Sequence, residues 1–167
     1  MLSSDQVVHE LYDSPQVRDA VVERFGESAA PDGAVDRGAL ARLAFASPDE
    51  RAWLEQLVWP LVGERVAQWR EELELASPTP RAAVVEVPLL FESAMDRAFD
   101  ATIAVVADER VRAQRAGGRG HEALAERGAR QLTQQEKAQR ATYVVVNDGS
   151  PEELEQKLSS ILEMLAR

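Results

Sequence analysis

The sequence predicts an α/β fold in which helices cover a parallel β-sheet. Three short runs rich in Val and Ile show no alternation of apolar and polar residues, which is typical of strands buried on both faces: residues 82–87, 101–107 and 142–146. Helical patterns lie between and around these runs. No hairpin turn connects any two of the runs, so neighbouring strands are expected to be parallel.

Helix starts are marked by hydroxyl residues that can cap the first turn: Ser14, Ser47, Thr133 and Ser150. In three of these segments a Glu follows at the third helical position, where its carboxylate can bond back to the capping residue. The last helix carries an apolar stripe that is expected to face a core: Leu154, Leu158, Ile161, Leu162 and Leu165.

A long helical stretch from about Val35 to Glu74 interrupts the alternation of strands and helices. Because Pro cannot donate the helical hydrogen bond, we expect one helix to end and another to begin at Pro60. The three Trp residues of the chain all lie in this stretch, where we expect core packing rather than ligand binding. The stretch is therefore predicted to be a helical insertion in the α/β core.

The composition narrows the class of protein. The chain has 167 residues, of which 45% are hydrophobic and 29% charged, as in an ordinary single globular domain. No apolar run is long enough to span a membrane, and the first residues have neither the basic flank nor the apolar stretch of a secretion signal. We therefore expect a cytoplasmic protein without membrane contact.

The charge is unevenly distributed along the chain. The formal net charge is −10, yet residues 110–140 hold eight Arg or Lys residues against three Glu. The acidic remainder argues against binding to nucleic acid or to anionic membranes. The basic segment favours a compact anionic ligand, such as a phosphorylated small molecule; the alternative is a solvated pair of helices without a ligand.

Arginine spacing within the basic segment supports the first interpretation. Arg112, Arg115 and Arg119 are spaced i, i+3 and i+7, which places them on one face of a helix. Three guanidinium groups there could neutralise a triphosphate and the charge that develops during phosphoryl transfer. The Gly residues at 117, 118 and 120 are typical of a hinged lid.

Polar residues follow each predicted strand. In open parallel sheets, ligands bind beyond the carboxyl ends of the strands, which here are followed by residues 87–92, 108–110 and 147–150. The segment Leu2–Asp5 is interpreted as the end of a fourth strand. Asp5 is then a candidate general base or metal ligand at the same edge, the alternative being a simple helix N-cap.

Other reaction classes leave little trace in the sequence. The two His residues, His9 and His121, are far apart and the chain has no Cys, which excludes a zinc site of Cys and His and a Cys–His nucleophile pair. No G-x-S-x-G element is present either, so the sequence does not predict the common hydrolase elbow.

Several motifs, in a specific order, make the sequence resemble the dephospho-CoA kinases, P-loop enzymes that phosphorylate the ribose 3′-hydroxyl of dephospho-CoA with ATP. The resemblance extends from Leu2 to the C-terminus and rests on these segments: Ser3–Val8, Asp32–Phe45, Trp59–Val62, Val87-Pro88-Leu89-Leu90-Phe91-Glu92, Arg115 with Arg119, Gln131–Ala141, and Asn147-Asp148-Gly149-Ser150 with Leu154.

The resemblance implies a three-layer αβα P-loop NTPase-like fold over residues 1–167, with a helical acceptor-binding insertion at about 13–81 and a small helical lid at about 110–140. It implies ATP as co-substrate, Mg²⁺ as cofactor and dephospho-CoA as partner, and leaves the oligomeric state open. It assigns catalytic roles to Asp5 and Arg115, with Asp5 also a Mg²⁺ ligand. The implied ATP-binding residues are Arg115, Arg119, Asn147 and Gly149, and the implied acceptor-binding residues are Arg37, Pro88, Leu89, Phe91 and Glu92.

The sequence departs from the family pattern at its start. Members of that family begin with a strand and a G-x-x-x-x-G-K-[ST] loop that cradles phosphate. This sequence contains no such loop, and Met1 corresponds to a position inside the family's second strand. The resemblance therefore implies that the first strand and the P-loop are missing from the chain, which alone is expected to have little or no kinase activity.

The sequence departs from the family pattern at two further positions, and two alternative functions remain open. Ser3 stands where the family has its first Asp, and Trp59 where it has a His before Pro60, so acceptor binding is expected to differ. The alternatives are a non-catalytic CoA- or nucleotide-binding relative, and a nucleoside-monophosphate-type kinase with another acceptor.

Overall fold

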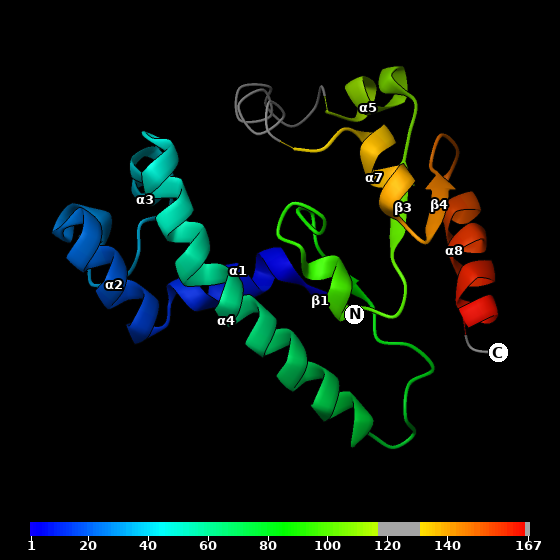
Figure 1. Cartoon of the computed structure of the whole chain (residues 1–167), viewed down its shortest axis with the longest axis horizontal. Coiled ribbons are helices and arrows are strands. Elements are labelled where there is room, and N and C mark those ends of the chain that lie inside the picture. Colours follow the sequence, from blue (N-terminus) through cyan, green and yellow to red (C-terminus); the bar gives the residue numbers. More distant parts are fainter. Residues whose placement is uncertain (117–130, 166–167) are drawn as a thin grey trace. The chain divides into compact units, whose positions relative to one another are not determined.

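The computed structural model describes residues 1–116 and 131–165 (Figure 1). The chain divides into two compact units, Met1–Pro88 and Leu89–Arg167. Each unit combines a pair of parallel strands with helices, so the predicted α/β class is confirmed.

The first unit is mainly helical. Its elements are β1 (Leu2–Ser3), α1 (Ser4–Tyr12), α2 (Pro15–Phe25), a 3-10 turn (Glu27–Ala29), α3 (Arg37–Ala44), α4 (Pro48–Glu74) and β2 (Val85–Glu86). β1 and β2 are parallel, with Leu2 opposite Val85 and Ser3 opposite Glu86. The strand end predicted over Leu2–Asp5 is confirmed only at Leu2–Ser3, because Ser4 and Asp5 already belong to α1, and the strand predicted over residues 82–87 is likewise only two residues long.

α4 corrects the expectation that a helix ends at Pro60. The helix runs unbroken from Pro48 to Glu74 with Pro60 inside it. Val58 and Val62, on either side of the proline, are both buried. A proline inside a helix is about 3 kcal/mol less favourable than an alanine. Packing of the two valine side chains offsets this cost and keeps the backbone helical at Pro60.

A compact apolar core joins α2, α3 and α4. Its buried members are Val17, Val21, Ala29, Val35, Leu40 and Ala44. Trp53 packs edge-on against Phe25 with ring centroids 5.4 Å apart. Arg24 lies over the same Trp ring and donates two hydrogen bonds to the Glu50 carboxylate, at 2.8 and 3.0 Å. Trp53 is thus a core residue, as predicted.

The second unit is built around a longer strand pair. Its elements are a 3-10 turn (Met95–Ala98), β3 (Ile103–Val106), α5 (Glu109–Ala116), α7 (Gln134–Arg140), β4 (Tyr143–Val146) and α8 (Pro151–Leu165). β3 and β4 are parallel and in register from the Ile103–Tyr143 pair to the Val106–Val146 pair. α7 packs against β3 and α8 against β4 (Figure 1). Both strands therefore end at the same level, ahead of α5 and α8.

Burial of the strands is less complete than the apolar runs predict. The described strands form two separate two-stranded sheets, and Val84, Val105, Val144 and Val146 are 40–49% exposed. A pair of strands has two open edges and few neighbours that could cover its side chains. The expectation of strands covered on both faces is therefore wrong at these four positions in the described structure.

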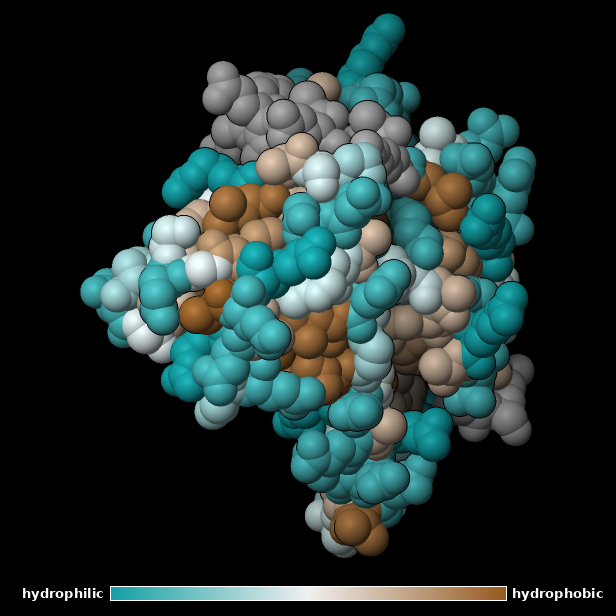
Figure 2. Space-filling view, turned by 60° about the vertical axis from the view of Figure 1, so that its left-hand side comes forward, coloured by the Kyte–Doolittle hydropathy of each residue, from teal (hydrophilic) through white to brown (hydrophobic). Residues whose placement is uncertain are grey.

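The face of the molecule seen in Figure 2 is largely hydrophilic. Figure 2 shows separate apolar areas among hydrophilic side chains. Among the described residues the exposed large apolar side chains include Phe45 at the end of α3 and Leu75 at the end of α4. No helix within residues 1–116 and 131–165 is long and apolar enough to cross a membrane.

Candidate active site

Asp5 lies where β1 gives way to α1. The N-cap of α1 is Ser3, and Asp5 lies in the first helical turn, with its side chain exposed. The alternative of Asp5 as a simple N-cap is therefore wrong. A carboxylate in the first turn is stabilised by the positive end of the helix, and here it also directly follows a strand end. The position suits a group that must reach a ligand.

Arg37 is the first residue of α3. Asp36 caps α3 by accepting a hydrogen bond from the Ala39 backbone N–H at 3.0 Å, and this bond lowers the pKa of Asp36. Burial raises the pKa of the Tyr12 hydroxyl, and the positive charge of Arg37 acts against that rise. Arg37 is thus an exposed cation of the first unit whose charge is felt at Tyr12, the last residue of α1.

The acceptor residues predicted after β2 lie in a tight turn. Pro88 ends the first unit, and Leu89 and Phe91 begin the second. The turn is closed by hydrogen bonds to the Leu89 carbonyl from the Ser93 backbone N–H, at 3.0 Å, and from the Ser93 hydroxyl, at 2.8 Å. Leu89 and Phe91 are half-buried in this turn.

Glu92 connects this turn to the start of α7. Its Oε1 accepts a hydrogen bond from the Leu132 backbone N–H at 2.9 Å and lies 3.1 Å from Lys137 Nζ. The side chains of Glu92 and Lys137 are only 15% and 24% exposed. Oε2 of Glu92 is buried without a hydrogen bond from any described residue. Glu92 therefore has a clear structural role besides the predicted contact with an acceptor.

The loop between β4 and α8 gathers the predicted nucleotide residues of the second unit. Arg115 donates from Nη1 to the Asn147 carbonyl at 2.7 Å and from Nη2 to the Gly149 carbonyl at 3.0 Å. Asp148 Oδ1 accepts a hydrogen bond from the Asp108 backbone N–H at 2.6 Å. Arg115 is therefore in direct contact with both Asn147 and Gly149, the two other described residues that the resemblance assigns to ATP binding.

The predicted helix face also includes Arg112 and Arg119. Arg119 lies outside the described residues. Arg112 donates to Glu109 of its own helix at 2.9 Å. α5 therefore presents Arg115 toward the strand ends, while Arg112 has an acidic partner of its own.

The match to known proteins identifies the family. The dephospho-CoA kinase family model matches residues 1–153. The chain belongs to the dephospho-CoA kinase family. The dephospho-CoA kinase of Protochlamydia amoebophila is 36% identical over 169 residues, covering 98% of this chain and 83% of that protein. That of Deinococcus radiodurans is 35% identical over 171 residues, covering 99% and 80%.

Solved structures agree with the family. A crystal structure of a Thermus thermophilus protein is similar with a TM-score of 0.72 and 32% identity, covering 98% of this chain and 83% of that one. The dephospho-CoA kinase from Campylobacter jejuni has a TM-score of 0.69 at 20% identity, covering 99% and 84%, which supports the fold. The predicted P-loop NTPase-like class is confirmed, the family is one of transferases, and neither alternative function is favoured.

The sequence does not predict two residues whose side chains bind the backbone at the ends of β3 and β4. The Gln134 side chain forms two hydrogen bonds with the Ala107 backbone, at 2.9 and 3.0 Å. Lys157 donates to the Val146 carbonyl at 2.7 Å. Each lies at the start or middle of a predicted helix with nothing in the sequence to connect it to a strand end.

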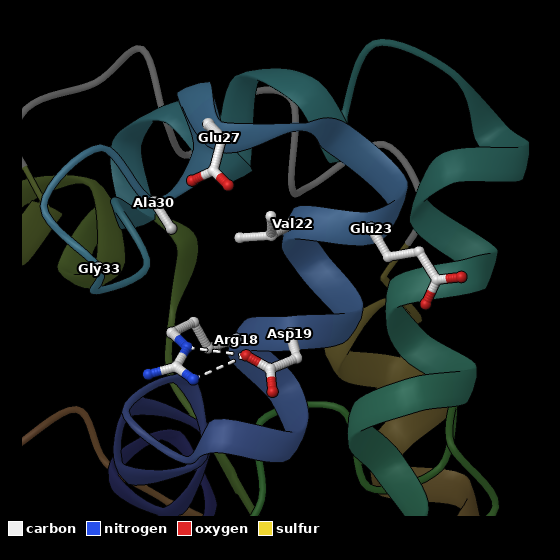
Figure 3. A pocket seen from close by; sticks show the side chains of 7 residues that line it. All are labelled: Arg18, Asp19, Val22, Glu23, Glu27, Ala30 and Gly33. Atoms are coloured by element: carbon white, nitrogen blue, oxygen red, sulfur yellow. Dashed lines mark hydrogen bonds and ion pairs between the residues drawn. The ribbon is translucent and has the colours of Figure 1, made fainter.

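An open hollow of about 380 Å³ in the first unit contains none of the predicted site residues (Figure 3). Arg18, on its wall, donates both its hydrogen bonds to neighbouring Asp19. The residues that line the hollow include three acidic residues, Asp19, Glu23 and Glu27, and one basic residue, Arg18, and this acidic excess is unfavourable for anionic substrates. We therefore place no part of the active site here.

A metal ion would have few protein ligands in the described structure. Residues 1–116 and 131–165 contain no group of three or more His, Cys, Asp or Glu side chains placed to hold one. Mg²⁺ bound to a nucleotide commonly needs only one or two carboxylates, because phosphate and water supply its other ligands. The single exposed carboxylate of Asp5 is compatible with such a site.

Proposed function

We propose that this protein is a dephospho-CoA kinase, which transfers the γ-phosphoryl group of ATP to the 3′-hydroxyl of dephospho-CoA. The family match over residues 1–153 carries this proposal. The clustering of Arg115 with the 147–149 loop at the end of β4 supports it, because this is where a ligand binds in an open parallel sheet. ATP as the donor implies action in the cytoplasm.

Asp5 is the proposed group at the attacking hydroxyl. Its exposed carboxylate, beyond the end of β1, accepts the proton of the 3′-hydroxyl or holds Mg²⁺. Bound Mg²⁺ would neutralise charge on the phosphates of ATP. Either role places a negative charge where the hydroxyl loses its proton, so both make Asp5 essential for turnover.

Cationic side chains are the proposed partners of the phosphates. Arg115 and Arg119 are proposed to contact ATP phosphates within a lid at about 110–140, with Arg115 stabilising the transferred group. Arg37 is the proposed contact of the anionic acceptor in a helical insertion at about 13–81. Asn147 and Gly149 are proposed to lie beside adenine, and Pro88, Leu89, Phe91 and Glu92 beside the acceptor.

The test is a coupled and mass-spectrometric assay of CoA formation from ATP and dephospho-CoA. The assay is run on the 167-residue chain and on the longest in-frame product of the source gene. The form that produces CoA is called the active form, and it is used in all the kinetic experiments below. CoA formation that depends on ATP is the expected result. Phosphorylation of AMP or a nucleoside in place of dephospho-CoA would instead identify another acceptor class, and binding of dephospho-CoA without turnover of either form would identify a non-catalytic relative.

A further inference from the structure

Carbonyl groups at the end of β4 and in the β4–α8 loop are bound by cations from two different helices. Lys157 of α8 donates to the Val146 carbonyl at 2.7 Å. Arg115 of α5 donates to the carbonyls of Asn147 and Gly149 through the two branches of its guanidinium group, at 2.7 and 3.0 Å. A planar fork that bridges two carbonyls fixes their separation and direction, which a single contact cannot do.

The loop is also fixed at its α8 end, where Ser150 caps α8 by accepting a hydrogen bond from the Glu153 backbone N–H at 3.3 Å. The Asn147 backbone N–H donates to the Val106 carbonyl at 2.8 Å, and Asp148 Oδ1 accepts from the Asp108 N–H. These contacts hold the two ends of the loop, and Arg115 adds a contact to the Gly149 carbonyl between them. The Arg115 side chain is exposed, so the bridge lies at the surface and its loss does not disturb the core.

We infer that Arg115 is a positioning residue for the adenine-binding loop, and that it sets the preference for adenine over guanine. This inference rests on the proposed function. Each carbonyl oxygen has two lone pairs, so one occupied by Arg115 leaves the other for a donor on the base. The 6-amino group of adenine donates to such an oxygen, whereas the 6-oxo group of guanine is repelled by it. A loop held by Arg115 therefore favours ATP over GTP.

Substitutions of Arg115 can separate the effect of its positive charge from the effect of its forked shape. Lys keeps the positive charge that a phosphate contact needs, but its ammonium group cannot reproduce the planar fork. Arg115→Lys therefore tests the bridge, and Arg115→Met removes both bridge and charge. Arg110, exposed on the same helix, gives the matched controls Arg110→Lys and Arg110→Met.

The first measurement is amide hydrogen exchange over residues 147–150 in the ligand-free 167-residue chain. Exchange is expected to be about fivefold faster in both Arg115 variants, because two charge-assisted hydrogen bonds at an exposed site are lost. The Arg110 variants should exchange at the rate of the unmodified chain. Unchanged exchange in Arg115→Met would overturn the inference, and this result does not depend on any kinase activity.

The second measurement compares ATP and GTP as phosphoryl donors for the active form. In Arg115→Lys we expect the KM for ATP to rise about tenfold and the ATP-to-GTP preference to fall by a similar factor. A fall in kcat with KM and base preference unchanged would overturn the inference and leave a role at the phosphates alone. Absence of turnover with either donor in the unmodified protein would overturn the proposed function, and the inference with it.

Discussion

Asp5 combines a strand end, a helix start and solvent exposure in one residue. Asp5→Asn keeps the shape and the hydrogen-bonding oxygen of this side chain but removes its charge. We expect kcat to fall about 10²–10⁴-fold, because proton acceptance and metal binding both need the carboxylate. The KM for ATP should change little if the charge acts mainly in the transition state.

Steady-state kinetics of CoA formation measure this effect. Glu10→Gln is the matched control, because Glu10 is an exposed carboxylate on the same helix whose partner is the nearby Gln6 side chain. Normal turnover by Asp5→Asn would remove Asp5 from the chemistry and assign its charge to the stability of α1.

The Glu92–Lys137 pair predicts a stability effect within the second unit. Both side chains are largely buried, and Glu92 Oε2 has no hydrogen bond from the described residues. Lys137→Met leaves this carboxylate with less compensation of its charge, so we expect a loss of about 2 kcal/mol in the free energy of unfolding. Urea denaturation measures it.

A double-mutant cycle isolates the pair from the other contacts of Lys137. In Glu92→Gln with Lys137→Met, the charge that was left uncompensated is gone, so the double variant should lose less stability than the two single variants together. Strictly additive losses would show that the charges of Glu92 and Lys137 are not coupled.

The short helix α7 depends on its capping box. Thr133 Oγ1 accepts from the Glu136 backbone N–H at 3.2 Å, and Glu136 Oε2 accepts from the Thr133 backbone N–H at 2.7 Å. The second bond, with help from the Thr133 hydroxyl, lowers the pKa of Glu136 below its ordinary value of 4.5. Such a reciprocal cap matters most in a helix of seven residues, which has little stability of its own.

The lowered pKa gives α7 a defined pH dependence. A carboxyl group whose pKa is lower in the folded state stabilises that state above its unfolded pKa, and the stabilisation is lost as the pH falls through the folded pKa. We therefore expect exchange of the α7 amides to accelerate as the pH drops below 4.5, after correction for intrinsic rates. Glu136→Gln should abolish this pH dependence; its persistence in that variant would assign it to another group.

Helix starts in this chain can be predicted because capping is local. Ser14, Ser47, Thr133 and Ser150 each accept the expected bond from a backbone N–H three residues on. Pro60 shows the limit of local reasoning, since burial of Val58 and Val62 carries α4 through it. Strand lengths also depend on residues that are distant in the sequence. A Val-rich run predicts a strand, but pairing with another strand decides how many of its residues join a sheet.

Some parts of the candidate site could likewise be predicted from the sequence, and others could not. The rule that ligands bind at strand ends located Asp5 and the 147–149 loop from sequence alone. The contacts of Gln134 and Lys157 with strand-end backbone could not be predicted, because long side chains reach them only after the helices have packed. Glu92 was predicted as an acceptor residue, and its bond to Leu132 became visible only in the fold.

The chain as a whole has opposing electric fields. Its net charge is −10, which repels ATP, while the excess of Arg and Lys in residues 110–140 attracts it. Salt screens both over a distance on the order of 10 Å at 0.1 M, so the response of ATP binding to salt reveals which field dominates. If the basic segment is the proposed phosphate contact, its charges lie within this distance of the bound nucleotide.

We therefore expect the KM for ATP to rise several-fold when the salt concentration is raised from about 50 to about 300 mM. The measurement is CoA formation by the active form at saturating dephospho-CoA and constant free Mg²⁺. Binding of adenosine, which has no phosphate charge, is the control and should respond weakly to salt. A fall in the KM for ATP with added salt would mean that repulsion by the acidic remainder outweighs the basic segment. The segment would then be a solvated surface, and its place in the proposed ATP site would be lost.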